Sequence, residues 1–164
     1  MPPPHALSSP IELFRAIPEQ ARALTEIALA AKSSWHYPAA WLRAWESQLT
    51  VSPEFIRHTP TFVALRDRTP LAWAAVNFDT TDAHLEHLWV HPAAMHQGLG
   101  RTLFRHIETI ARAHHATRLL ILSDPHAENF YFRLGAFRLR LEPAPVCGIP
   151  RFLPLLSKPL GPSV

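Results

Sequence analysis

The sequence contains a single cysteine, Cys147, so no disulfide can form within the chain and nothing in it implies an oxidising compartment. It also lacks any run of about 18 uncharged apolar residues, so no membrane-spanning helix is expected. The first residues, MPPPHALSSP, have neither the basic region nor the apolar core of a secretory signal. These absences make a cytoplasmic location the default expectation. The 164 residues suit a single domain, of which residues 1–10 are expected to be flexible.

Concentrated charge is scarce as well. No block of five like charges occurs, and 16 Lys and Arg face 13 Asp and Glu, for a formal net charge of +3. Nucleic-acid binding would need a concentrated basic stripe, so neither nucleic acid nor a membrane is expected as a partner. The mild positive balance suits a small phosphorylated ligand equally well.

Metal-binding motifs are missing despite 11 histidines. The pairs His84/His87 and His91/His96 come closest to ligand spacing, but there is no HExxH, and no CxxC accompanies them. No metal cofactor is expected.

The spacing of apolar residues predicts strands that alternate with helices. Strands are predicted over 11–17, 61–65, 71–78, 84–90, 118–122, 136–142 and 151–156, and helices over 18–31, 38–49, 99–114 and 124–135. The run RLLIL (118–122) is typical of a strand buried on both faces. On the helix from 99, an outer side is predicted to carry Arg101, Arg105, Glu108 and Arg112, with Glu108 and Arg112 as an i,i+4 pair. The order predicts an α/β protein with a mixed sheet covered by helices.

Two of the five glycines, Gly98 and Gly100, lie where an apolar strand gives way to a helix. The N-terminus of a helix suits phosphate, because it offers unpaired backbone N–H groups and the positive end of the helix dipole. A glycine there lets a ligand approach the backbone, and Arg101 can add a charge-assisted hydrogen bond. The alternative is that both glycines only make a tight turn.

Two familiar phosphate motifs do not fit this stretch. A P-loop ends in Gly-Lys-Ser/Thr, whereas Arg101-Thr102 follows Gly100. A dinucleotide fingerprint needs a small residue at Leu103 and an acidic residue about 20 positions later, and neither requirement is met.

The stretch VHPAAMHQGLGRTL (90–103) resembles the acyl-CoA-binding motif of the GNAT superfamily of N-acetyltransferases, Val-x-Pro followed by Arg/Gln-x-x-Gly-x-Gly/Ala at the start of a helix. A second stretch, DPHAENFYFRLGAF (124–137), is similar to the family's later Phe-Tyr and Leu-Gly-Ala-Phe segment. The two occur in the family's order. Three features depart from the pattern: Met95 replaces the usual Arg or Gln, Asp124 replaces a frequent asparagine, and the hairpin RDRTPLAW lacks the usual glycines.

The resemblance implies a GNAT-like fold, with a mixed, mostly antiparallel sheet of six to seven strands flanked by about four helices. It also implies acetyl transfer from acetyl-CoA to a primary amine by direct attack in a ternary complex. The positions that match the family's CoA-binding residues are Leu88, Trp89, Val90, Met95, His96, Gln97, Gly98, Leu99, Gly100, Arg101, Thr102, Asn129 and Tyr131.

Tyr131 matches the tyrosine that the family places near the CoA sulfur, which makes it the candidate general acid. The backbone N–H of Val90 matches the region where the family holds the oxyanion. Strict alternation along 84–90 predicts that His84, Glu86, Leu88 and Val90 share one face and that His87 and Trp89 share the other. Glu86 is therefore the first candidate base, with His84 or His87 behind it.

The acceptor is expected to be a small-molecule amine. In the family, the region of Trp35, Tyr37, Trp41 and Trp45 walls the acceptor cleft, although these rings could equally belong to the core. Glu46 and Asp79 are further groups that could attract an ammonium. A protein or peptide N-acetyltransferase and a non-catalytic acyl-CoA-binding sensor are the alternatives. The sequence leaves open whether the protein forms a homodimer. It also leaves open whether the proline-rich segment 142–162 covers the acceptor site or a partner.

Overall fold

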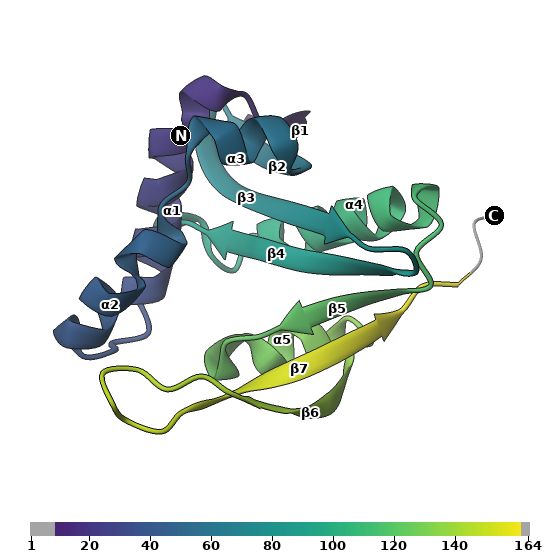
Figure 1. The fold of residues 1–164 in the computed structure, drawn as a ribbon. Coiled ribbons are helices and arrows are strands. Elements are labelled where there is room, and N and C mark those ends of the chain that lie inside the picture. The colour runs from purple at the N-terminus through teal and green to yellow at the C-terminus, as the bar shows by residue number, and fades with distance from the viewer. Residues whose placement is uncertain (1–8, 162–164) are drawn as a thin grey trace, which may run out of the picture.

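One seven-stranded sheet runs through the molecule in the order β1-β2-β3-β4-β5-β7-β6 (Figure 1). The structure is a computed structural model that describes residues 9–161, so most of the start expected to be flexible lies outside it. The strands are β1 Glu12–Arg15, β2 Thr61–Arg66, β3 Thr69–Phe78, β4 Asp82–Val90, β5 Arg118–Leu122, β6 Phe137–Pro143 and β7 Phe152–Pro159. Among these described strands, only β4 and β5 pair in parallel. The predicted mixed, mostly antiparallel sheet is confirmed.

Within residues 9–161, five α-helices cover the two faces of this sheet: α1 Ala21–Ser33, α2 Ala39–Leu49, α3 Pro53–His58, α4 Leu99–Ala113 and α5 Glu128–Arg133. Helices α1, α2 and α3 pack on one face, which we call the α1 face, and α4 and α5 pack on the other, the α4 face. No helix within residues 9–161 is long and apolar enough to cross a membrane.

Helix α3 was not predicted, although its start carries an ordinary signal. The Ser52 hydroxyl accepts a hydrogen bond from the Phe55 N–H at 3.0 Å, and Pro53 occupies the first turn. At six residues the helix is too short for apolar periodicity to reveal it.

The apolar side of α4 packs on the sheet. Leu103, Phe104 and Ile107 are fully buried, and each stabilises the fold by about 1.5–3 kcal/mol. The prediction that Glu108 lies on the outer side is wrong, because this residue is only 1% exposed. The predicted pair with Arg112 does form, at 3.6 Å.

The burial of Glu108 depends on cations around it. Arg105 lies 2.9 Å from one of its carboxylate oxygens, and Lys158 of β7 lies 3.7 Å from the other. A buried carboxylate needs such compensation, and β7 supplies part of it from a position 50 residues further along the chain.

Candidate active site

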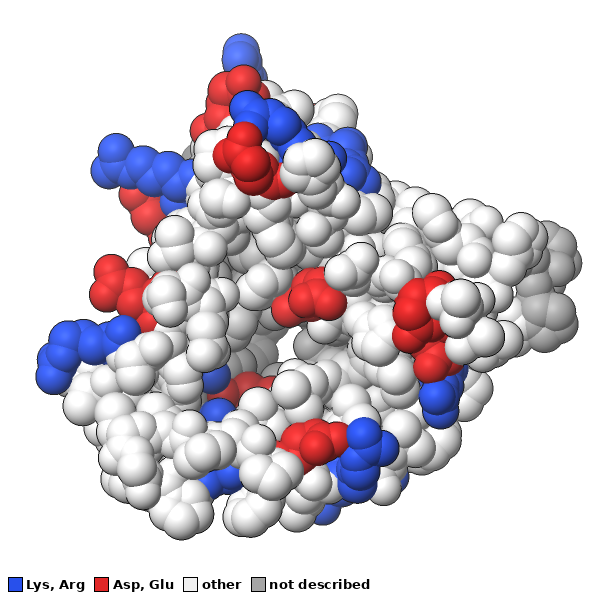
Figure 2. Space-filling model, viewed as in Figure 1, with Lys and Arg blue, Asp and Glu red and all other residues white. Residues whose placement is uncertain are grey.

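Strands β4 and β5 separate halfway along their length, and the site is built around this opening. They pair only from Asp82 to Leu85 on β4, while the rest of β4 remains bonded to β3 alone. The opening between the two strands is visible in Figure 1, and the space-filling view of the same face is hollowed at its centre (Figure 2). The prediction that β5 is buried on both faces is wrong at its end, because Leu122 borders this opening and is 53% exposed.

A cavity of about 200 Å³ occupies the opening, and we call it the acceptor-side cavity. Its walls come from α1, α2, β4, β5 and the start of β7, and include Lys32, Trp35, Trp45, Glu86, His87, Asp124, Arg151 and Leu153. The proline-rich segment therefore borders this cavity through Arg151 and Leu153. It also contacts α2, where the Cys147 thiol lies 3.8 Å from the Ala40 carbonyl oxygen.

A β-bulge at Glu86 changes which residues of β4 share a face. Leu85 pairs with Val76, and His87 pairs with the next residue of β3, Ala75, so Glu86 is the extra residue. Strict alternation across this point was a wrong prediction. His84 lies on the α1 face, opposite to Leu88 and Val90, because the extra residue shifts the phase of the strand.

Beyond the bulge the predicted alternation holds. Trp89 pairs with Trp73, and His87 with Ala75, on the α1 face. Leu88 and Val90 pack against the core of the α4 face.

The unpaired edge of β4 directs backbone N–H groups into the opening. The His91 N–H donates to the Leu71 carbonyl oxygen at 2.8 Å, so it points toward β3. Successive N–H groups along a strand point to opposite sides, so those of Val90 and Leu88 point away from β3. Neither N–H bonds to β3, and both point into the opening.

A second cavity, of about 380 Å³, lies at the N-terminus of α4, and we call it the CoA-side cavity. Gly98 precedes the helix with φ +82° and no side-chain cap, and the first helical bond runs from the Thr102 N–H to the Gly98 carbonyl. The N–H groups of residues 99–101 consequently lack acceptors within the helix. This arrangement, with the Arg101 and Arg133 side chains in the cavity wall, fits a phosphorylated ligand.

The two glycines have different roles in the structure. Gly98 adopts a left-handed conformation that side chains rarely take, and a Cβ there would meet nothing within 4 Å. A Cβ on Gly100 would lie 3.2 Å from the Phe130 ring, so this glycine permits close packing of α4 on α5. The approach of a ligand to the backbone at these glycines stays a prediction; both line the cavity, and Gly98 has open space beside it.

Ten of the thirteen residues matched to CoA binding line this cavity: Leu88, Trp89, Val90, Met95, His96, Gly98, Leu99, Gly100, Arg101 and Tyr131. The structure does not bring Gln97, Thr102 and Asn129 to it. The Gln97 side chain instead accepts a bond from Arg66 at 3.0 Å, and the Thr102 hydroxyl donates to the Gly98 carbonyl at 3.1 Å. Asn129 is exposed on α5.

Tyr131 lies where the two cavities meet. It lines both of them, as do Trp35, Leu88, Trp89 and Ala127. Its ring packs on Phe104 and Phe130, so it belongs to the core as well. Burial raises the pKa of its phenol, and the Asp124 charge raises it further, so the group stays protonated at neutral pH.

The candidate bases differ in environment. Glu86 is exposed and lines the acceptor-side cavity. Neither His84 nor Asp79 lines either cavity, and they bond to each other at 2.8 Å. The pKa of Asp79 is lowered to about 2, first by this hydrogen bond. Glu46, on α2, lines neither cavity.

His87 lies inside the acceptor-side cavity wall, and its Nδ1 accepts a bond from the Trp89 indole N–H at 3.1 Å. Burial lowers its pKa to about 4. The imidazole is therefore neutral at physiological pH.

This lowered pKa predicts a loss of stability in acid. In the unfolded chain a histidine has a pKa of about 6.5. Below that pH the unfolded chain therefore binds a proton that the folded chain does not bind. The stabilisation is complete above that pH and is lost as the pH falls toward 4, amounting to about 2 kcal/mol between pH 7 and pH 5. Denaturant unfolding at both pH values should show that His87→Gln, which keeps an acceptor for Trp89, removes this part of the pH dependence. The exposed-site control His58→Gln should retain it, and equal curves for wild type and His87→Gln would refute the assignment.

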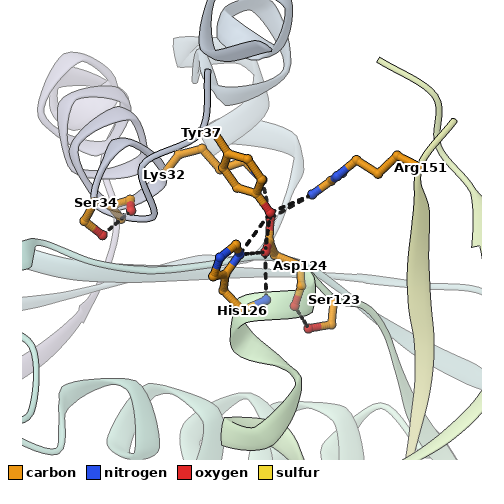
Figure 3. A network of polar contacts seen from close by, with 8 residues as sticks. Lys32, Ser34, Tyr37, Ser123, Asp124, His126 and Arg151 are labelled. Carbon is orange, nitrogen blue, oxygen red and sulfur yellow. Dashed lines mark hydrogen bonds and ion pairs between the residues drawn. The ribbon is translucent and has the colours of Figure 1, made fainter. Parts of the chain in front are cut away.

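A polar cluster at one end of the acceptor-side cavity was not predicted from sequence. Lys32, Tyr37, His126 and Arg151 converge on Asp124 (Figure 3). These residues come from four separate segments, up to 119 positions apart, so spacing along the chain carries no signal for them. The one local indication of this cluster in the sequence was Asp124, which replaces a frequent asparagine of the GNAT pattern.

Comparison with known proteins agrees with this architecture. The model of the acetyltransferase (GNAT) family matches residues 21–136. None of the curated proteins compared with the chain matches its sequence significantly.

Three solved structures illustrate the similarity of fold. A GCN5-related N-acetyltransferase from Rhodopseudomonas palustris superposes with a TM-score of 0.79 at 22% identity, over 95% of this chain and 99% of the other. PaiA N-acetyltransferase from Thermoplasma acidophilum, solved with coenzyme A, gives 0.74 at 16% identity, over 92% and 99%. The ribosomal-protein-S18-alanine N-acetyltransferase from Escherichia coli gives 0.70 at 17%, over 94% and 97%. The chain belongs to the GNAT family of acetyltransferases and is an acyltransferase.

Proposed function

We propose that the protein transfers an acetyl group from acetyl-CoA to the primary amine of a small molecule. The observation that carries this proposal is the junction of two cavities at the β4–β5 opening, with Tyr131 in the wall of both. One cavity offers helix N–H groups and arginines suited to phosphates, and the other is bordered by a carboxylate and aromatic rings.

The CoA-side cavity would hold the phosphates of acetyl-CoA at the N-terminus of α4. Gly98 leaves room beside the unpaired N–H groups, and Arg101 and Arg133 supply positive charge. The coenzyme A in the PaiA structure supports acetyl-CoA as the acyl donor.

In the proposed reaction the amine nitrogen attacks the thioester carbonyl carbon directly. The resulting oxyanion accepts hydrogen bonds from the backbone N–H of Val90, with that of Leu88 alongside. The C–S bond then breaks, and the CoA thiolate takes the proton of the Tyr131 hydroxyl. Before the attack, the acceptor ammonium gives one proton to Glu86, directly or through water, and Glu86 passes it to solvent; after the attack, the nitrogen of the tetrahedral intermediate loses its second proton to solvent. Tyr131 regains its proton from solvent, so the enzyme returns to its starting state.

The dimensions of the acceptor-side cavity favour a small acceptor over a peptide. Its volume is about 200 Å³, and α1, α2 and the start of β7 form part of its wall. Ligand sites of drug-sized molecules usually reach about 300–1,000 Å³, so this one suits a compact amine.

Calorimetry with acetyl-CoA, followed by assay of thiol release with a panel of small amines and peptides, tests the proposal. We expect micromolar binding and turnover with at least one small primary amine. Absence of acetyl-CoA binding, or binding without turnover on any acceptor, would refute it. Turnover restricted to peptides would replace the small-molecule acceptor by a peptide.

A further inference from the structure

The polar cluster around Asp124 is a built, nearly buried charge arrangement that borders the acceptor-side cavity. The side chains of Lys32, Asp124 and Arg151 are only 10%, 7% and 10% exposed. Lys32 Nζ lies 2.6 Å and Arg151 Nη2 3.0 Å from the same carboxylate oxygen, Oδ2. Both cations also lie over the Trp45 ring, at 4.3 Å and 4.8 Å from its centroid.

The carboxylate of Asp124 has no capacity for another cation. Its Oδ1 accepts from the Tyr37 hydroxyl at 2.9 Å and from the His126 backbone N–H at 2.9 Å, and it lies 3.0 Å from Nδ1 of the His126 ring, while Oδ2 holds Lys32 and Arg151. Four acceptor positions are thus filled, which is about the number that a carboxylate offers. Burial alone would raise the pKa of Asp124, but the hydrogen bond and charge of Lys32 outweigh it and the pKa falls below its usual value.

The cluster therefore holds two cations against one anion. Burial lowers the pKa of Lys32, and the Asp124 hydrogen bond opposes that shift. Of the other charged or titratable residues that line the cavity, Glu86 is exposed and His87 is neutral. Two buried cations thus share one buried carboxylate, while the other carboxylate of the cavity wall, Glu86, is exposed to solvent, which screens its charge.

Arg151 also has hydrogen-bond donors that no other group within residues 9–161 accepts from. Arg151 uses Nη2 for Asp124 and for the Tyr37 oxygen at 3.1 Å, and no hydrogen bond among residues 9–161 uses its Nη1 or Nε. Neither atom is among the fully buried atoms without a partner, so both remain accessible. Nη1 and Nε lie on opposite sides of the guanidinium, so each of them can donate a single charge-assisted hydrogen bond to a carboxylate oxygen.

We propose that the acceptor is an amine that also carries a carboxylate, as a free amino acid does, and that Arg151 and Lys32 bind this carboxylate. The proposal rests on the proposed function and specifies its acceptor. The apolar walls, among them Trp35, Leu49 and Leu153, take the side chain of the acceptor. Acceptors that carry only positive charge, such as polyamines, are disfavoured, because Lys32 and Arg151 place two buried cations in the cavity wall.

The test compares amino acids with their carboxamides on the wild-type protein. L-leucine, L-phenylalanine and L-methionine are each paired with the amide, which has nearly the same shape but no negative charge. The amine of the amide is also the more easily deprotonated of the two, so a preference for the acid cannot arise from amine basicity. We expect kcat/KM for at least one acid to exceed that of its amide by about 10- to 100-fold.

Arg151→Gln supplies the second comparison. This variant should lower kcat/KM for the amino acid about 10-fold or more and change that for the amide by less than about threefold, with acetyl-CoA affinity retained. Arg22→Gln, at an exposed pair with Glu26 on α1, is the control for loss of an arginine. If Arg151→Gln does not fold, the comparison of acid with amide on Lys32→Gln and on the wild-type protein tests the inference.

Binding without acetyl-CoA gives a readout that does not depend on turnover. Trp35, Trp45 and Trp89 line the cavity, so their fluorescence should respond to L-leucine or L-phenylalanine more strongly than to the amides. Turnover of amides at least as fast as that of the acids would overturn this inference and leave the proposed function intact. Failure to bind acetyl-CoA would overturn the proposed function itself.

Discussion

Gly98→Asp is expected to weaken acetyl-CoA binding by at least about 100-fold, which corresponds to about 3 kcal/mol. The residue lies at the entry to α4 in the wall of the CoA-side cavity, beside N–H groups that have no acceptor in the helix. An aspartate there would bring a negative charge against the ligand phosphates and would itself accept bonds from those N–H groups. Calorimetry with acetyl-CoA on the purified variant measures the loss.

Gly98→Asn separates charge from bulk and from backbone strain. Asparagine has nearly the same size as aspartate, and both tolerate the left-handed conformation that Gly98 adopts at φ +82°. We expect the asparagine variant to retain clearly more affinity than the aspartate variant. Equal losses would show that bulk dominates, and unchanged binding in both would mean that Gly98 only turns the chain.

Tyr131→Phe is expected to lower kcat by about 100-fold while acetyl-CoA affinity stays within about threefold of wild type. The hydroxyl is the part of the ring that could protonate the leaving thiolate, and its raised pKa keeps it protonated. No hydrogen bond among residues 9–161 involves this hydroxyl, so the variant should fold with nearly unchanged stability. Steady-state kinetics and calorimetry on the same preparation separate catalysis from binding.

The pH dependence of two variants distinguishes the acid from the base. In Glu86→Gln, activity should recover as the pH rises, because the acceptor amine then loses its proton to solvent without help. In Tyr131→Phe no such recovery is expected, since the missing group is a proton donor. An unchanged kcat in Tyr131→Phe would rule out its role as the acid.

The family and the general fold follow from local sequence, for identifiable reasons. The strand, the glycine-containing turn and helix α4 are consecutive in the chain, so residues 90–103 carry the CoA-side motif in one stretch. The apolar periodicity of α4 and the run in β5 are also local properties, and both elements were predicted with nearly correct ends. Apolar periodicity does not predict short elements such as α3, because six residues make less than two helical turns.

Tertiary structure decided the finer geometry of the site. The bulge at Glu86 depends on pairing with β3 and moves His84 to the other face, which alternation along β4 alone cannot reveal. The need for Gly100 comes from Phe130 on α5, a contact between two helices. The charge beside the acceptor-side cavity comes from Lys32, Asp124 and Arg151, which lie on α1, after β5 and before β7. The sequence by itself determined the family and the CoA-side motif, because both depend on residues that are neighbours in the chain. The arrangement of charges on the acceptor side was decided only by folding, because those residues meet only across the sheet.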